Sequence, residues 1–291
     1  MPACSTIPPG KKSGFVLLIL AVAFLAAALP PVTAYAELEE ERSWELFPDR
    51  GRAFEPLGAD PREAAFTFGF LYDDDGDWYE DLNFGFDFGF LWLRLGPETT
   101  MTFTGRGIFT SRFDMFSDSF DLLNIDYVGG LAHGLDLGDH EFEAFVYHQS
   151  SHLGDEILDR GERRRIDYGR EALRLLWGYR VGDFRFYLGG TYNFHAEVED
   201  IDGAFWAQTG FEYRFAPWGQ PMFAGLNLHA QEEHDFSPDV TLRYGVDLGD
   251  PAVTENRQQV FVQYYNGHMN LGQFWDEWEA YVMIGAAYRF R

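Results

Sequence analysis

A histidine and a serine two positions apart, His148 and Ser150, are the residues of this sequence whose types and spacing could support chemistry. They lie in a stretch that alternates like a β-strand, where residues i and i+2 point to the same side. A histidine base beside a serine nucleophile is the core of acyl-transfer chemistry. The histidine also needs a third group to orient it, and Glu156 and Asp167 are candidates that follow in the sequence.

The residues after this pair could contact a ligand or a lipid. We expect that role for seven of them, namely Ser151, His152, Asp155, Glu156, Arg163, Arg164 and Arg165. The arginines could bind the phosphates of lipopolysaccharide, because a guanidinium group contacts phosphate with two hydrogen bonds. The alternative is that His148 and Ser150 are polar residues at the rim of a barrel and that the arginines pair with neighbouring acids.

The sequence predicts no metal site and no cofactor. The acidic run Asp73–Asp77 could bind calcium, but it lacks the ligand spacing of an EF-hand loop, so we expect a solvated acidic loop. Several histidines fall near the outer ends of the expected strands, and no two of them have the spacing of metal ligands. These histidines are His195, His229, His234 and His268.

The N-terminus has the layout of a secretory signal peptide. Lys11 and Lys12 precede an apolar run at residues 15–29, and small residues around Ala36 offer a cleavage point. We therefore expect a cleaved signal peptide at 1–36 and export from the cytoplasm.

The cysteine count and the net charge exclude further classes of chemistry. The only cysteine, Cys4, lies within the expected signal peptide, so the exported chain has no disulfide. The formal net charge of −25 repels phosphates, which excludes a nucleic acid as partner. Beyond the signal peptide there is no second long apolar run, which argues against a helical membrane protein.

The elements that must position the candidate residues are β-strands. In residues 82–94, every second residue from Phe84 to Trp92 is a large aromatic, and the other face has the small or polar residues Asn83, Gly85, Asp87 and Gly89. This segregation is typical of a barrel strand between lipid and a polar interior. Twelve stretches have such alternation, at about 64–72, 82–94, 99–110, 121–132, 140–150, 171–181, 183–194, 204–215, 220–230, 239–248, 257–266 and 279–290.

The connections between these stretches alternate between short turns and long polar loops. Outer-membrane barrels have short periplasmic turns and longer outer loops. We therefore predict an all-β fold, a single antiparallel transmembrane barrel of about twelve strands at 63–291, preceded by a periplasmic lead-in at 37–62. A soluble periplasmic β-sandwich that binds a ligand is the alternative, and the aromatic face of 82–94 argues against it.

Strand parity also predicts which charged residues face the interior. They are Asp87, Arg106, Asp126, Glu141, Glu143, Arg174, Arg180, Arg185, Glu212, His229, Arg243, Asp247 and Arg289. Buried charges must be paired, so this mixture of arginines and acids favours ion-pair networks that fill the lumen. A selective aqueous path is the alternative.

Several segments resemble known proteins. The final Gly285, Tyr288 and Phe290 resemble the C-terminal signal of proteins handed to the barrel assembly machinery, which the resemblance implies as a partner during biogenesis. The pair His148 and Ser150 resembles the H-x-S of outer-membrane phospholipase A and the lipid A deacylases. This chain departs from phospholipase A after the serine, where Ser151 and His152 replace Asn-Gly.

The whole exported chain is similar to the bacterial family called domain of unknown function 1207. The matching segments are 54–63, 147–156, 166–171 and 263–267, and the most specific text is Ser-Ser-His-Leu-Gly-Asp-Glu at 150–156. The resemblance implies a one-domain envelope protein of Gram-negative bacteria and no particular activity.

The functional prediction from the sequence places a structural or transport role before an enzymatic one. We expect an outer-membrane barrel that is structural, forms a narrow pore, or contacts lipids or another ligand. The expected partners are outer-membrane lipids or lipopolysaccharide. The alternative is a lipid esterase of the outer membrane, with Ser150 as nucleophile and His148 as base.

Overall fold

The computed structural model describes residues 43–49, 52–161, 163–198, 203–248 and 257–289, all within the compact unit of residues 43–291. The predicted signal peptide at 1–36 lies outside the described residues. Within these ranges, no helix is long and apolar enough to cross a membrane.

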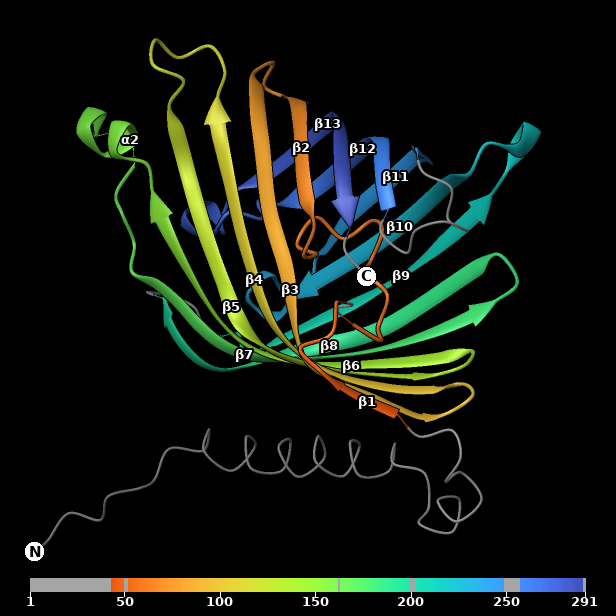
Figure 1. The fold of residues 1–291 in the computed structure, drawn as a ribbon. Coiled ribbons are helices and arrows are strands. Elements are labelled where there is room, and N and C mark those ends of the chain that lie inside the picture. The colour runs from red at the N-terminus through yellow and green to blue at the C-terminus, as the bar shows by residue number, and fades with distance from the viewer. Residues whose placement is uncertain (1–42, 50–51, 162, 199–202, 249–256, 290–291) are drawn as a thin grey trace, which may run out of the picture. The chain divides into compact units, whose positions relative to one another are not determined.

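Twelve antiparallel strands form a closed barrel, as the alternation predicts (Figure 1). Each strand pairs with its neighbours in the chain, and β2 pairs with β13 to close the ring. Closure satisfies the backbone hydrogen bonds of every strand, which lipid cannot do. The strands are β2 (Phe66–Asp73), β3 (Trp78–Gly96), β4 (Thr99–Asp114), β5 (Leu122–Leu137), β6 (His140–Leu153), β7 (Tyr168–Val181), β8 (Phe184–Val198), β9 (Phe205–Phe215), β10 (Met222–Gln231), β11 (Pro238–Asp247), β12 (Arg257–His268) and β13 (Trp278–Arg289).

A few short elements complete the described chain. A thirteenth strand, β1 (Ser43–Leu46), pairs with the far end of β3 along the edge that β2 leaves uncovered. The connections between strands hold a helix and three 3-10 turns, which are α2 (Asp155–Arg160), η2 (Pro217–Gly219), η3 (Glu232–His234) and η4 (Gly272–Phe274).

The two faces of the strands differ as the parity predicts. Phe84, Phe86 and Phe88 lie on the outer face and are 42–52% exposed, whereas Asn83 and Gly85 on the opposite face are buried. An outer face of this kind suits hydrocarbon, because apolar side chains need no polar partner there. Gly85 faces inward where the chain passes close by, and a Cβ there would lie 2.5 Å from the backbone nitrogen of Ala65.

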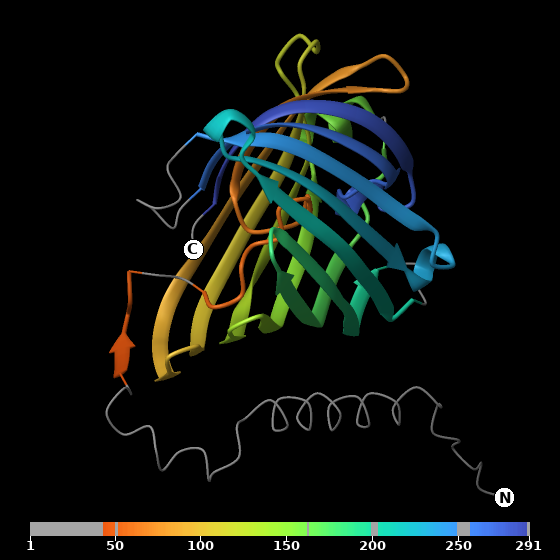
Figure 2. The same cartoon turned by 90° about the vertical axis from the view of Figure 1, so that its right-hand side faces the viewer.

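Residues 52–65, just before β2, run inside the barrel, as both views show (Figure 2). We expected residues 37–62 to form a periplasmic lead-in ahead of the barrel, but the described residues 52–62 lie within the lumen and are mostly buried. The physical reason is that main-chain groups of this segment meet charged side chains of the wall. Arg289 donates to the carbonyl oxygens of Leu57 at 2.7 Å and Gly58 at 2.8 Å. Arg243 donates to the same Gly58 oxygen at 3.0 Å.

An ion-pair network joins this lumenal segment to the wall. Arg52 pairs with Glu63 at 2.7 Å and with Asp87 at 3.2 Å. Arg106 pairs with Asp87 at 2.7 Å and with Glu143 at 2.8 Å. These side chains are almost fully buried, so each charge depends on its partners to offset the cost of leaving water.

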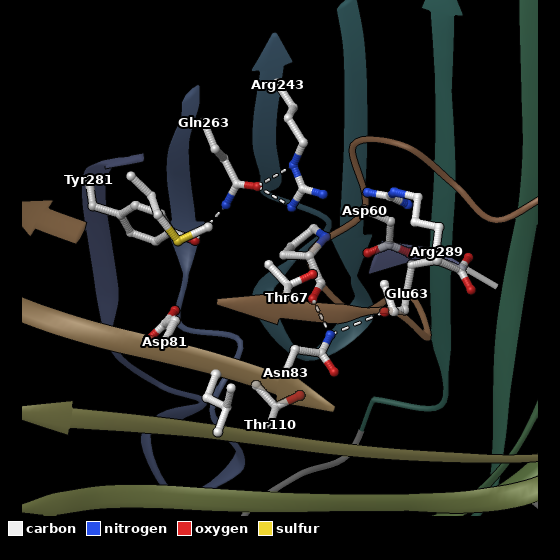
Figure 3. A pocket seen from close by; sticks show the side chains of 14 residues that line it. Asp60, Glu63, Thr67, Asp81, Asn83, Thr110, Arg243, Gln263, Tyr281 and Arg289 are labelled. Atoms are coloured by element: carbon white, nitrogen blue, oxygen red, sulfur yellow. Dashed lines mark hydrogen bonds between the residues drawn. The ribbon is translucent and has the colours of Figure 1, made fainter. Parts of the chain in front are cut away.

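A small pocket lies beside the end of the lumenal segment (Figure 3). Asn83 donates to the main-chain oxygen of Glu63 at 3.1 Å, and Arg243 donates to Gln263 at 2.8 Å. The cavity between Asp60 and Tyr281 has a volume of about 30 Å³, and a second cavity, between Arg174 and His229, has a volume of about 70 Å³. The smaller of the two cavities holds no more than about two water molecules.

The connection between β12 and β13 enters the other end of the lumen. The backbone nitrogen of Gly272 donates to Asp126 at 3.0 Å. Gln273, fully buried, donates to the main-chain oxygens of Ser151 at 2.9 Å and Ile166 at 3.0 Å. The lumen is therefore occupied from both ends.

We expect the wild-type barrel not to conduct ions and the double variant Arg243→Met/Arg289→Met to conduct. The substitutions remove three hydrogen bonds that hold the carbonyls of Leu57 and Gly58, so the lumenal segment loosens. Conductance in planar bilayers is the measurement, and heat-modifiable gel migration verifies that the variant is folded. An Arg94→Met variant, changed at an exposed position near the end of β3, is the control. Equal conductance of the wild type and the folded double variant would refute this role of the segment.

We also expect Glu63→Gln to unfold more easily than the wild type at pH 7, by about 3 kcal/mol. Burial alone would raise the pKa of Glu63, but Arg52, Arg174 and Arg106 outweigh it and hold the pKa below its usual value. A lowered pKa in the folded state adds stability above the unfolded value of 4.5, and this stability is lost as the pH falls below it. Urea unfolding in detergent micelles measures the free energy of unfolding of both proteins. The difference between wild type and variant should become smaller from pH 5 to pH 3, and a difference that stays constant would contradict the ion pairing.

Candidate active site

Three polar residues form a row across the outer surface of β6, β7 and β8. His148 of β6 lies directly opposite Glu171 of β7, and Glu171 lies opposite His195 of β8. Cross-strand partners have their Cβ atoms about 5 Å apart, so these three side chains can interact. The row lies on the exposed face of the sheet and not in the lumen.

Glu171 joins the two histidines through both of its carboxylate oxygens. Nδ1 of His148 lies 2.9 Å from Oε1 of Glu171, and Nδ1 of His195 lies 2.6 Å from Oε2. An ionised carboxylate only accepts hydrogen bonds, so both rings donate from Nδ1. When the rings are neutral, Nε2 of each one is left as a base. The histidine side chains are 55% and 56% exposed.

Ser150 lies beside His148 on the same face, two residues further along β6. Its partner on β7 is Gly169, and a Cβ built on Gly169 would lie 3.9 Å from Cε1 of His148. The ring of His148 therefore leans over the glycine next to the serine. Gly129 is the partner of His148 on β5, and a Cβ there would meet no atom within 4 Å. The outer surface beside the pair is therefore open.

The site lies where the apolar outer face gives way to polar loops. Val146 is the next outward residue of β6 below His148, and Leu173 holds the same place on β7 below Glu171. The helix α2 and the long connection to β7 follow the end of β6 that lies just beyond Ser150. The geometry offers a base, an orienting carboxylate and a hydroxyl at the edge of this apolar outer face.

The carboxylate beside His148 is Glu171, and not one of the two candidates named from the sequence. Glu156 belongs to α2, and Asp167 immediately precedes β7. Glu171 and His195 escaped the sequence reasoning because cross-strand pairing brings them together from strands that are 23 and 24 residues away. The segment 166–171, which resembles the family, contains Glu171, and this resemblance was the sequence feature that could have indicated its role.

The other predicted contact residues have different surroundings. Ser151 faces the lumen, is 3% exposed and donates to Asn124 at 3.0 Å. His152 points outward and accepts from Arg165 at 3.3 Å. Arg163 pairs with Asp276 at 2.8 Å and with Glu277.

The remaining members of that predicted set lie near the same end of the barrel. Asp155 and Glu156 form the first turn of α2, and Arg164 belongs to the connection between α2 and β7. Gly154 just before them is required by packing, because a Cβ there would lie 1.6 Å from the oxygen of Leu122. In the part of the chain that the structure describes, no group of three or more histidine, cysteine or acidic side chains is placed to hold a metal ion.

Comparisons with known proteins give a family and a fold. A family model described as "Protein of unknown function (DUF1207)" matches residues 43–290. Outer membrane phospholipase A from Escherichia coli is similar in structure, with a TM-score of 0.55 and 13% identity over 78% of this chain and 93% of that one. The outer membrane phospholipase dimer of Salmonella typhi with bound calcium has a TM-score of 0.54 and 12% identity, over 82% and 95%. The search of curated protein sequences found no match. At these identities the likeness concerns the fold, which is that of outer-membrane barrels.

We expect the end of the barrel that carries this site to face the outside of the cell. A cysteine placed at Asp159 in α2 should react with a membrane-impermeant maleimide on intact cells. A cysteine placed at Trp218, which is 98% exposed in a short turn at the opposite end, should react only after lysis. The single native cysteine, Cys4, precedes the expected cleavage point, so the background is low. The reverse labelling pattern would mean that the end with α2 faces the periplasm, which contradicts this prediction.

Proposed function

This chain belongs to the DUF1207 family of proteins of unknown function, and we propose that it is a serine acyl hydrolase acting on lipid esters at the outer membrane. The observation that carries the proposal is the hydrogen bond between His148 and Glu171 beside Ser150. A nucleophile, a base and a group that orients the base are the parts that acyl transfer requires.

The reaction follows from the roles of the three side chains. Oγ of Ser150 attacks the ester carbonyl carbon, and its proton passes to Nε2 of His148. Glu171 stabilises the positive charge on the imidazolium. The ester C–O bond then breaks, and the leaving alcohol takes the proton from Nε2.

The second half of the reaction restores the serine. A water molecule attacks the acyl-serine ester and gives a proton to Nε2 of His148. The bond between the acyl carbon and Oγ breaks, Oγ takes the proton back, and the fatty acid leaves. No oxidant and no further reactant is needed.

The location of the site supports a lipid as substrate. The outward residues below the site, such as Val146 and Leu173, are apolar, so acyl chains can lie against them while the ester reaches Ser150. The similarity to outer membrane phospholipase A agrees with this assignment at the level of the fold. The occupied lumen argues against the pore that the sequence also suggested.

We expect the refolded protein in detergent to release fatty acid from a diacyl lipid, and Ser150→Ala to lower the rate at least about 10³-fold. Glu171→Gln should lower it about 10²-fold or more, because the tautomer of His148 is no longer fixed. A fluorophosphonate should label the wild type, and peptide mapping should place the label on Ser150.

Ser237→Ala, a serine of the connection between β10 and β11, is the matched control and should keep full activity. Each variant should show the heat-modifiable migration of a folded barrel. Hydrolysis by Ser150→Ala at the wild-type rate, or no release from any ester lipid by the wild type with and without calcium, would refute the proposed function.

A further inference from the structure

A β-bulge in β8 is what turns His195 toward Glu171. Glu171 pairs with His195, but the next residue, Ala172, pairs with Asn193, so Phe194 is an extra residue in β8. Asn193 faces the lumen and is 6% exposed, whereas both Phe194 and His195 are exposed on the outside. Regular alternation from Asn193 would turn position 195 inward. Bulges re-aim side chains in this way and are frequent beside active sites.

The bulge gives Glu171 a second partner on the side away from His148. A glutamate has three rotatable side-chain bonds, and an exposed one ordinarily samples many rotamers. Here Oε2 is held by His195 at 2.6 Å, so Oε1 is directed at His148 at 2.9 Å. The carboxylate is about one-third exposed, so fixing its orientation requires contacts of this kind.

We propose that His195 is a positioning residue that acts on the reaction through Glu171, and this inference rests on the proposed function. His195 holds the carboxylate in the rotamer that keeps the proton of His148 on Nδ1 and leaves Nε2 as the base for Ser150. The outer surface therefore carries a cluster of four cooperating groups from three strands, and not an isolated serine and histidine.

The kinetic test compares His195→Ala with His195→Asn in the refolded full chain. His195→Ala should lower kcat about tenfold with little change in KM, because it removes a hydrogen bond to a charged group that does not touch the substrate. It should also change the pH profile of kcat. His195→Asn should recover most of the rate, because the amide nitrogen of asparagine can donate from the place of Nδ1.

Two controls separate positioning from general effects. His140→Ala removes an exposed histidine at the opposite end of β6 and should leave kcat unchanged. Glu197→Gln removes a negative charge from the neighbouring row, opposite Gly169, and should have a small effect. An unchanged kcat in His195→Ala, or equal losses in His195→Ala and His195→Asn, would overturn the proposal.

A second measurement judges the positioning role without any turnover. Nitrogen-15 NMR of the histidine rings in micelles should show His148 protonated at Nδ1 in the wild type, with a larger fraction of the other tautomer in His195→Ala. If the wild type hydrolyses no lipid, the proposed function fails, and an unchanged His148 spectrum in His195→Ala would also overturn the inference. If the wild type is active but the His148 tautomer is insensitive to His195, only the inference fails.

Discussion

The pairing of buried charges inside the barrel is the interaction on which the rest of the structure depends. Arginines and acids of the wall face a lumen that protein segments largely occupy, so each buried charge needs a partner. The wall alone does not supply all the partners. The segment 52–65 provides carbonyl oxygens for Arg289 and Arg243 and a guanidinium group, that of Arg52, for Asp87 of β3. The reaction that we propose takes place on the outer surface of this barrel.

The proposed reaction depends on the rigid wall of the barrel, because the strands fix the positions of the reacting side chains. Ser150, His148, Glu171 and His195 come from three adjacent strands whose positions are fixed by backbone pairing. Strands hold side chains more accurately than loops do, and acyl transfer needs that accuracy. Gly129 and Gly169 have no side chains, so the surface beside His148 and Ser150 is open to a large substrate.

Much of the architecture could be predicted from the sequence, because barrel strands alternate between lipid and lumen with a period of two. All twelve predicted stretches correspond to strands, and the predicted inward residues such as Arg106 and Glu143 form buried pairs. The place of residues 52–62 could not be predicted, since it depends on partners up to 232 residues away. The pair His148 and Ser150 was visible as a local motif. Glu171 and His195 required the strand register, and the bulge at Phe194 breaks the very alternation on which the prediction relied.

The lumenal segment also constrains the order of assembly. Residues 52–65 are made before every strand from β2 to β13, yet Arg243 and Arg289, which hold Leu57 and Gly58, stand near the end of the chain. Contacts between such distant parts of a sequence form late, after the loop between them has closed. The segment therefore cannot reach its final place until the last strand is present, and the last strand cannot bury its arginine without the segment. Insertion of the segment into the lumen and closure of the ring are therefore a single folding step. This step brings together residues from the beginning and the end of the barrel sequence.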